Sequence, residues 1–342
     1  MVTFIVHGGY GKTATSFLQQ IVFSHLDDVL YFGKLKDDKM LPDELGRLYY
    51  EIFPPFSRTV LPMRARNSSL LIPQLGDLLI KEMKKASKKI VLLSNECLID
   101  YANYNAELNM LLLYRLFNYL QDNYDEGIEF KMMMTIRNQK EFLKSYYAYD
   151  FSVLKERFST LQKFIQYGIA NNHEIVFGGC HYDLVWEDME KIFGKKNVQF
   201  FIYERMKKDI HSYLNNIFEF IGTSQTMDTL DYDRKINVNF DGRVHRMRDV
   251  EYGFWASFMM KFYQHNKERL NFLTSLKGYH SFKNIVLSYC NNSMRVVDAG
   301  GLYDLPKDLV QRIDKIYKAS NQNLARKLDS DLETYGYIGG QK

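Results

Sequence analysis

The chain has 342 residues, of which 25% are charged and 46% are hydrophobic, a balance that is ordinary for a soluble globular protein. Its net charge of +4 is too small to favour nucleic acid as a partner, although a local basic cleft for an anionic ligand is compatible with it. No apolar run approaches the length of a membrane span, so the sequence predicts no such segment.

The three cysteines, Cys97, Cys180 and Cys290, are far apart and odd in number, and they show no metal-ligand spacing. This usage fits a reducing compartment. The first residues enter a strand directly, so we expect no signal peptide. Together these features predict a cytoplasmic location.

The chain begins with a strand, a glycine-rich turn and a helix, within residues 2–20. Such a turn directs backbone N–H groups and a helix N-terminus at one point, which suits an anion. Lys12 adds a full positive charge. Hydroxyl donors follow at Thr13, Thr15 and Ser16. The stretch is therefore interpreted as a cradle for a phosphate or phosphosulfate group.

A P-loop kinase is the alternative interpretation of this stretch. Gly11-Lys12-Thr13 fits the end of the pattern GxxxxGK[ST], but the position of its first glycine is occupied by Val6. A kinase that uses ATP and Mg²⁺ also needs a carboxylate to hold the metal. Glu96 is the one loosely plausible candidate.

The rest of the chain alternates between strands and helices. Residues 23–66 have no clear pattern, and residues 234–248 form a polar, basic loop that precedes a mostly helical remainder. Strands are predicted at residues 89–93, 130–136 and 197–203, and helices at residues 74–87, 105–123, 139–149, 153–171, 182–193 and 210–221. The alternation predicts one α/β domain with a parallel sheet and a helical C-terminal extension.

The segment from Arg137 to Tyr147, RNQKEFLKSYY, is the most specific motif. An arginine ends a predicted strand, and Ser145 follows eight residues later. This segment resembles the 3′-phosphate-binding segment of sulfotransferases that use 3′-phosphoadenosine 5′-phosphosulfate (PAPS). Residues 12–16, KTATS, are similar to the 5′-phosphosulfate loop of that family, and His7 also recurs in its bacterial and carbohydrate-directed members.

Two further segments agree with this resemblance. Residues 201–209, FIYERMKKD, are similar to the strand of the family that ends in YExLxxD. Residues 317–337 resemble the C-terminal YxxSNxxL…DLxxYGY region of bacterial-type members. The resemblance implies a P-loop-like three-layer fold with a central parallel sheet, in a single domain over residues 1–342 with its core at about 1–222 and the basic loop and helical region at about 223–342.

One position departs from the family pattern. The glycine usual after Lys-Thr is replaced by Ala14. Alanine is costly where φ is positive but is tolerated where the residue is already helical. We expect Ala14 to be helical.

The resemblance implies in-line transfer of the sulfuryl group of PAPS to a hydroxyl or amine, with PAP as the product. A sulfuryl group carries less charge than a phosphoryl group, so no metal is expected. The expected catalytic residues are Lys12, Glu96 and His7. The expected cofactor-binding residues are Gly9, Tyr10, Gly11, Lys12, Thr13, Ala14, Thr15, Ser16, Arg137, Ser145, Arg243 and Arg246.

The general base remains open among three residues. Glu96 follows the strand at 89–93, at a place where family members carry a catalytic His or Glu, and a helix-capping or ion-pair role is the alternative for it. His7 and His181 are the other candidates, and His7 has the alternative of a structural hydrogen bond that closes the loop. The acceptor is expected to be a glycan, glycolipid or small molecule.

Overall fold

The computed structural model describes residues 1–33, 43–53, 61–96, 98, 106–149, 151–226, 248–252, 294–298 and 305–338. The chain divides into two compact units. The first comprises Met1–Lys144, Ile165–Asp241 and Leu305–Lys342, and the second comprises Ser145–Phe164 and Gly242–Asp304. The expectation of a single domain stays a prediction.

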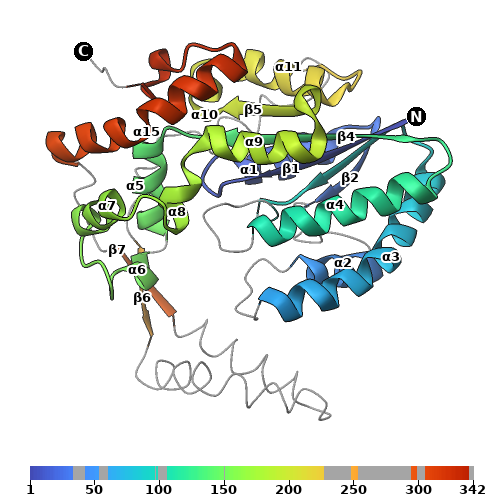
Figure 1. Cartoon of the computed structure of the whole chain (residues 1–342), viewed down its shortest axis with the longest axis horizontal. Coiled ribbons are helices and arrows are strands. Elements are labelled where there is room, and N and C mark those ends of the chain that lie inside the picture. Colours follow the sequence, from blue (N-terminus) through green and yellow to red (C-terminus); the bar gives the residue numbers. More distant parts are fainter. Residues whose placement is uncertain are drawn as a thin grey trace, which may run out of the picture. The chain divides into compact units, whose positions relative to one another are not determined.

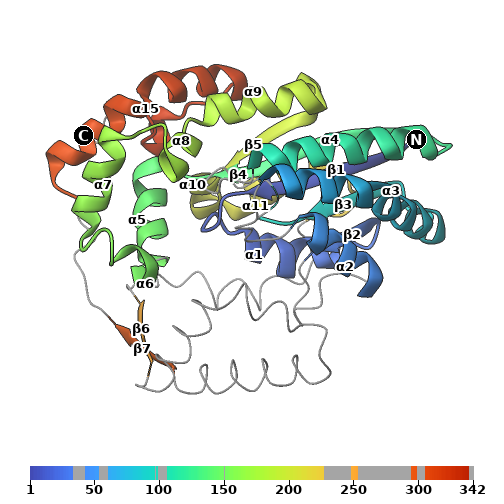
Figure 2. The same ribbon diagram turned by 60° about the horizontal axis from the view of Figure 1, so that its bottom comes forward.

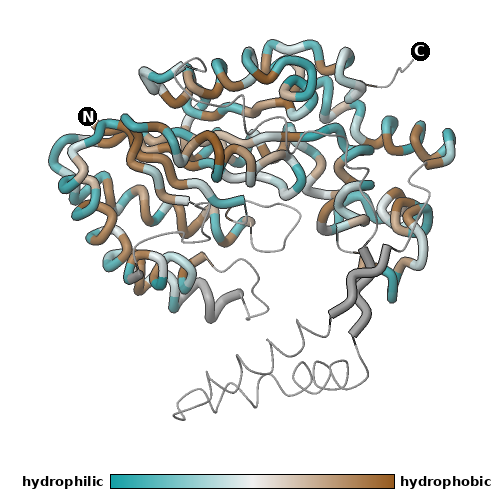
Figure 3. Tube along the Cα trace, turned by 180° about the vertical axis from the view of Figure 1, so that it is seen from behind, coloured by the Kyte–Doolittle hydropathy of each residue, from teal (hydrophilic) through white to brown (hydrophobic). Residues whose placement is uncertain are grey.

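A five-stranded sheet organises the first unit (Figure 1). Its strands are β1 (Val2–Gly9), β2 (Val29–Gly33), β3 (Ile90–Ser94), β4 (Ile128–Ile136) and β5 (Val198–Ile202). They lie in the order β2-β3-β1-β4-β5, and all neighbours are parallel. Figure 3 shows the apolar character of the strands, which is typical of a parallel sheet that is covered on both faces.

Side chains that alternate along the strands build two cores. On one face, Ile5, Leu92 and Met133 contribute to a core that also contains apolar side chains of residues 18–29 and of α11 (Ile210–Ile221). On the other face Phe4 contacts Phe117 of α4 (Ala106–Asn123), with ring centroids 6.1 Å apart. On this same face of the sheet, Trp186 of α9 (Tyr182–Phe193) packs against Phe200 of β5. The predicted three-layer α/β arrangement is therefore confirmed.

The helices lie mostly where the sequence predicts them. α4, α5 (Gln139–Tyr149), α9 and α11 match to within one residue at each end. The bounds of α11 follow from its caps, because the Asp209 side chain accepts from the backbone N–H of Ser212 at 3.0 Å and Gly222 ends the helix with φ 80°. α10 (Tyr203–Lys208) is a short helix directly after β5.

Other elements differ from the expectation. β2 lies within the stretch expected to be irregular, because five residues are too few for a clear period. α3 (Leu61–Ala86) begins earlier than predicted and includes Pro73. It packs beside α4 and α2 (Asp43–Ile52), as Figures 1 and 2 show. The helix predicted at 153–171 is divided into α6 (Phe151–Leu154) and α7 (Leu161–Ala170), and α8 (Ile175–Gly179) follows.

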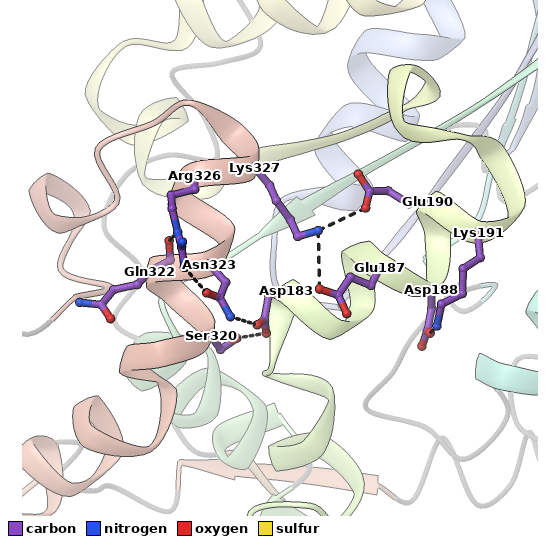
Figure 4. Close-up of polar contacts among 10 residues, drawn as sticks. All are labelled: Asp183, Glu187, Asp188, Glu190, Lys191, Ser320, Gln322, Asn323, Arg326 and Lys327. Atoms are coloured by element: carbon purple, nitrogen blue, oxygen red, sulfur yellow. Dashed lines mark hydrogen bonds and ion pairs between the residues drawn. The ribbon is translucent and has the colours of Figure 1, made fainter.

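The C-terminal helix α15 (Lys307–Leu328) packs on α9 through polar side chains (Figure 4). Ser320 donates a hydrogen bond to Asp183, and Asn323 donates to the same carboxylate at 2.9 Å. Lys327 lies 3.6 Å from the carboxylate of Glu187 and 3.2 Å from that of Glu190. These contacts attach the C-terminal segment to the sheet through α9.

In the second unit, β6 (Arg248–Tyr252) and β7 (Met294–Asp298) form an antiparallel pair. These two strands were not predicted, while α15 agrees with the expected helical C-terminal extension. Residues 253–293 lie outside the described residues. Within the helices that the structure describes, none combines the length and the apolar character needed to cross a membrane.

Candidate active site

The candidate site lies where three neighbouring strands end. β1 is the central strand, and its residue Gly9 lies opposite Thr135 of β4, while His7 lies opposite Ser94 of β3. Because parallel strands end at the same edge, the segments that follow them are brought together there. We call residues 9–16 the glycine loop and residues 137–139 the arginine turn.

The glycine loop contains three residues with positive φ. Gly9 has φ 134°, Lys12 has φ 69° and Ala14 has φ 64°. A Cβ atom at Gly9 would lie 3.3 Å from the Cβ of Met134. Thr13 closes the loop by donating its hydroxyl to the carbonyl oxygen of Tyr10 at 2.6 Å. Turns that mix left-handed and ordinary residues in this way are typical of backbone concavities that bind anions.

Ala14 corrects the sequence-based expectation. It is the N-cap of the following helix and has left-handed backbone angles, with φ 64° and ψ 20°. The expectation that it is helical is wrong, and a non-glycine residue in this region carries a strain of about 1–2 kcal/mol.

The helix after the loop is also less regular than expected. α1 has only three residues, Thr15–Phe17, and continues as a π-helical turn, Leu18–Val22, and a 3-10 turn, Phe23–His25. The free N–H groups of its first turn, the loop N–H groups and the charge of Lys12 would all favour an anion here.

Glu96 lies against the glycine loop. It follows β3 and is half-buried, and its carboxylate accepts a hydrogen bond from the hydroxyl of Thr15. Its neighbour Asn95 is fixed by the carbonyl of His7, which accepts from the Asn95 backbone N–H at 2.9 Å. The fold thus brings Glu96 against the loop that carries Lys12, although the two residues are 84 positions apart in the sequence (12 and 96).

His7 is enclosed behind the loop. It is 1% exposed, and its Nδ1 lies 2.7 Å from the hydroxyl of Ser94. Its ring packs against Phe23 with the centroids 5.0 Å apart. Burial lowers the pKa of His7 from 6.5 to about 3, so the imidazole is neutral at physiological pH. Its Nε2 has no hydrogen-bond partner among the described residues. These contacts favour the structural interpretation of His7.

Arg137 is the buried cation of the site. It is 3% exposed, and its Nη1 donates to the carbonyl oxygen of Lys12 at 3.1 Å. Its guanidinium lies over the ring of Tyr203, 4.9 Å from the centroid. Glu141 is the nearby acid, with 4.0 Å between its Oε2 and the Nη2 of Arg137. The Nε of Arg137 has no hydrogen-bond partner among the described residues.

A partly buried carboxylate supports the arginine turn. Glu204 accepts from the backbone N–H of Asn138 at 3.0 Å and from the hydroxyl of Tyr337 at 2.9 Å. Burial raises the pKa of Glu204, and its hydrogen bonds and Arg137 oppose that shift. Sequence reasoning found the motifs that hold Glu204 and Tyr337 but did not predict that they meet.

The C-terminal segment completes this support. Asn321 of α15 donates to the carbonyl of Tyr337 at 2.7 Å, and its Oδ1 accepts from the side chain of Gln139 at 2.7 Å. Asn138 donates to the carbonyl of Tyr335 at 3.3 Å. The hydroxyl of Tyr182 donates to the carbonyl of Arg137 at 2.8 Å. Side chains distant in the sequence therefore hold the arginine turn.

The other predicted site residues have different locations. Ser145 is the first residue of the second unit, and its hydroxyl is buried without a hydrogen-bond partner among the described residues. His181 caps the start of α9 with its ring centroid 5.0 Å from that of Tyr317, and burial lowers its pKa. Arg243 and Arg246 lie outside the described residues.

Within the described ranges, no group of three or more His, Cys, Asp or Glu side chains is arranged to hold a metal ion. The expectation that no metal is required stays a prediction. The donors gathered at the site, namely backbone N–H groups, an ammonium and a guanidinium, fit an anionic ligand.

The match to a protein family agrees with this chemistry. The chain matches the family described as "Sulfotransferase domain" over residues 4–239. No curated protein matches it significantly. A solved sulfotransferase from Alicyclobacillus acidocaldarius is 14% identical, with 97% of each chain covered and a TM-score of 0.47. Mouse sulfotransferase SULT7A1, in complex with PAP, is 16% identical, with 67% of this chain and 61% of that chain covered and a TM-score of 0.35.

The fold is therefore an α/β fold whose sheet edge carries a group of donors that suits an anion. Because the family match covers more than half of the sequence, the chain belongs to the sulfotransferase family. It is a PAPS-dependent transferase.

Proposed function

We propose that the protein transfers the sulfuryl group of PAPS to a hydroxyl or amine of a glycan, glycolipid or small-molecule acceptor, by in-line transfer with a general base. The observation that carries this proposal is that Glu96 and Arg137 both contact the glycine loop, which contains Lys12, at one edge of the sheet. We also propose a cytoplasmic location, from the three separated cysteines.

The donors at the site fit a ligand with two anionic ends. The glycine loop and Lys12 suit the 5′-phosphosulfate. Arg137 suits the 3′-phosphate, because its Nε is buried and unpartnered among the described residues and a guanidinium binds phosphate in a fixed fork. The sequence spacing adds Ser145 to this end, and Arg243 and Arg246 stay predicted ligands.

Each residue near the transferred group has a distinct proposed role. Lys12 stabilises the negative charge that develops on the leaving phosphate oxygen, and the loop N–H groups and the Ser16 hydroxyl hold that phosphate. The hydroxyls of Thr13 and Thr15 already donate to Tyr10 and Glu96, so they shape the loop and do not bind the phosphate. Glu96 accepts the proton of the acceptor. The hydroxyl of Thr15 holds the Glu96 carboxylate beside the loop. The bond from sulfur to the leaving oxygen breaks as the bond from the acceptor forms.

Glu96 is preferred to the two histidines as the base. His7 is 1% exposed and hydrogen-bonded to Ser94, so an acceptor cannot reach it without rearrangement of the core. His181 packs against Tyr317 at the start of α9. Glu96 is half-buried and accepts a hydrogen bond from Thr15 of the glycine loop.

Two measurements test the proposal. Addition of PAP in EDTA should raise the melting temperature of the purified protein, and PAPS labelled with ³⁵S should transfer label to at least one member of a panel of glycans, glycolipids and phenols. ATP with Mg²⁺ is the control for a kinase. No shift at millimolar PAP, or stabilisation by ATP with Mg²⁺ alone, would overturn the proposal.

A further inference from the structure

Arg137 physically joins the arginine turn to the glycine loop. Its Nη1 donates to the carbonyl oxygen of Lys12 at 3.1 Å, across 125 positions of sequence. The bond is formed by a side chain that is 3% exposed, so little water competes for it. The atom it holds belongs to the backbone of the residue that carries the proposed catalytic ammonium.

The backbone of Lys12 is in a conformation that needs support. Lys12 has φ 69°, and Ala14, two residues later, has φ 64°. Each costs about 1–2 kcal/mol relative to an ordinary backbone. Strained residues of this kind persist where surrounding contacts determine them. Arg137 supplies such a contact from outside the loop, whereas the Thr13 hydroxyl supplies one from within it.

Arg137 is itself held by several contacts, so it can fix the position of the Lys12 backbone. Its guanidinium lies over Tyr203, 4.9 Å from the ring centroid. Its carbonyl accepts from the hydroxyl of Tyr182 at 2.8 Å, and the next N–H donates to Glu204 at 3.0 Å. The ring of Tyr203 in α10 thus holds the guanidinium, and Tyr182 of α9 and Glu204 of α10 hold the backbone from which it extends.

We propose that Arg137 is a positioning residue for Lys12 as well as a ligand of the 3′-phosphate. Nη1 fixes the glycine loop, while the unpartnered Nε remains for the phosphate. The two ends of the nucleotide are then recognised by groups that are joined through one guanidinium. This inference rests on the proposed function for the identity of the ligand. The support that Arg137 gives to the glycine loop does not depend on that identity.

A ligand-free measurement tests the support directly. Hydrogen exchange of the amides of residues 11–16 should be at least about tenfold faster in Arg137→Lys, because the ammonium keeps the charge and loses the fork that reaches the Lys12 carbonyl. Ser145→Ala is the matched control, since Ser145 is the other proposed ligand of the 3′-phosphate. Unchanged exchange in folded Arg137→Lys overturns the proposal, whatever the ligand is.

A comparison of two nucleotides tests the coupling. AMP lacks the 3′-phosphate of PAP, so a residue that only binds this phosphate affects PAP alone. Calorimetry should show weaker binding of both AMP and PAP in Arg137→Lys, by at least about fivefold, and weaker binding of PAP alone in Ser145→Ala. An AMP affinity within twofold of wild type in Arg137→Lys contradicts the positioning role. Failure of the wild type to bind PAP contradicts the proposed function instead.

Folding of the variants is controlled separately. Arg137→Gln avoids leaving a lysine charge in a buried place, and its circular dichroism and melting curve show whether the fold is intact. It has no fork and no charge, so the same acceleration of exchange at residues 11–16 is expected. Folded Arg137→Gln with wild-type exchange at these amides would also overturn the inference.

Discussion

The glycine loop and the arginine turn are neighbours that are built in different ways. The glycine loop takes most of its shape from local features, with three positive φ values within six residues (9–14) and a hydroxyl bond from Thr13 to Tyr10, and Arg137 adds one contact from outside. The arginine turn takes its shape from distant side chains, including Glu204, Asn321 and Tyr337. The C-terminal segment is therefore part of the site although it contributes no proposed ligand.

The comparison separates two kinds of failure. A change in the glycine loop should alter the rate of transfer, because the loop carries the proposed charge-stabilising groups. A change in the support of the arginine turn should alter stability and nucleotide binding first.

Lys12→Ala should lower the rate of sulfuryl transfer on the order of 10²-fold or more, because it removes the cation beside the leaving oxygen. The melting temperature of the ligand-free protein should change little, since Lys12 is not part of the core. Single-turnover transfer of ³⁵S from PAPS measures the rate. Lys84→Ala, a change on the exposed end of α3, is the control, and a similar loss in both variants would contradict the assigned role.

Glu96→Gln should also lower the rate on the order of 10²-fold, because the amide cannot accept the acceptor proton. The Kd for PAP should stay within about threefold of wild type, since the Thr15 hydroxyl can still donate to the amide oxygen. Calorimetry and single-turnover kinetics separate the two quantities. Glu107→Gln, at the exposed start of α4, is the control. A rate within a few fold of wild type would return the search for the base to His181.

His7 makes the region behind the glycine loop sensitive to acid. Its pKa is about 3 in the folded protein against an ordinary 6.5, so the unfolded chain binds the proton first as the pH falls. The free energy of unfolding should therefore decrease below pH 6.5, by up to about 1.4 kcal/mol per pH unit, or about 2.7 kcal/mol by pH 4.5.

Urea unfolding at several pH values measures this effect. His7→Asn should lose the steep part of the pH dependence, whereas Ser94→Ala, which removes the hydrogen-bond partner and keeps the histidine, should retain it. Parallel curves for wild type and His7→Asn between pH 6.5 and 4.5 would show that His7 is not held neutral.

Tyr337→Phe tests the support of the arginine turn. The hydroxyl donates to Glu204 at 2.9 Å, and its loss leaves a partly buried carboxylate with one donor fewer, at a cost of about 1–2 kcal/mol in the free energy of unfolding. Binding of PAP should weaken severalfold. Tyr335→Phe is the matched control, because Tyr335 offers its ring to Arg205 and its carbonyl to Asn138. Equal effects in both variants would argue against a specific role for the Tyr337 hydroxyl.

Much of the fold could be predicted because it follows from local patterns. Apolar runs indicate β3, β4 and β5, and a capped amphipathic period indicates α11. The proximity of the glycine loop, Glu96 and Arg137 follows from the parallel order of the strands. The five residues of β2 gave too short a pattern.

The details of the site could not be predicted from local patterns. Glu204 lies 133 positions from Tyr337, and Arg137 lies 125 from Lys12, so no short segment encodes either contact. The sign of φ at Ala14 also depends on the tertiary structure. An alanine can adopt right-handed helical or left-handed backbone angles, and without other contacts it prefers the right-handed ones. The expectation for Ala14 was wrong for this reason.

Ala14→Gly gives the smallest effect and tests this point about the loop. Glycine removes the strain of φ 64° but adds freedom to the unfolded chain, so the net gain in the free energy of unfolding should be about 0.5–1 kcal/mol. Ala325→Gly, inside α15, should instead lower the free energy of unfolding by about 1 kcal/mol, because glycine has a lower helix propensity than alanine and no strain is relieved there. Urea unfolding of the two variants should therefore shift in opposite directions. Loss of stability in both variants would mean that Ala14 has no strain for glycine to relieve. Side-chain contacts, and not left-handed backbone angles, would then have to account for the shape of the glycine loop.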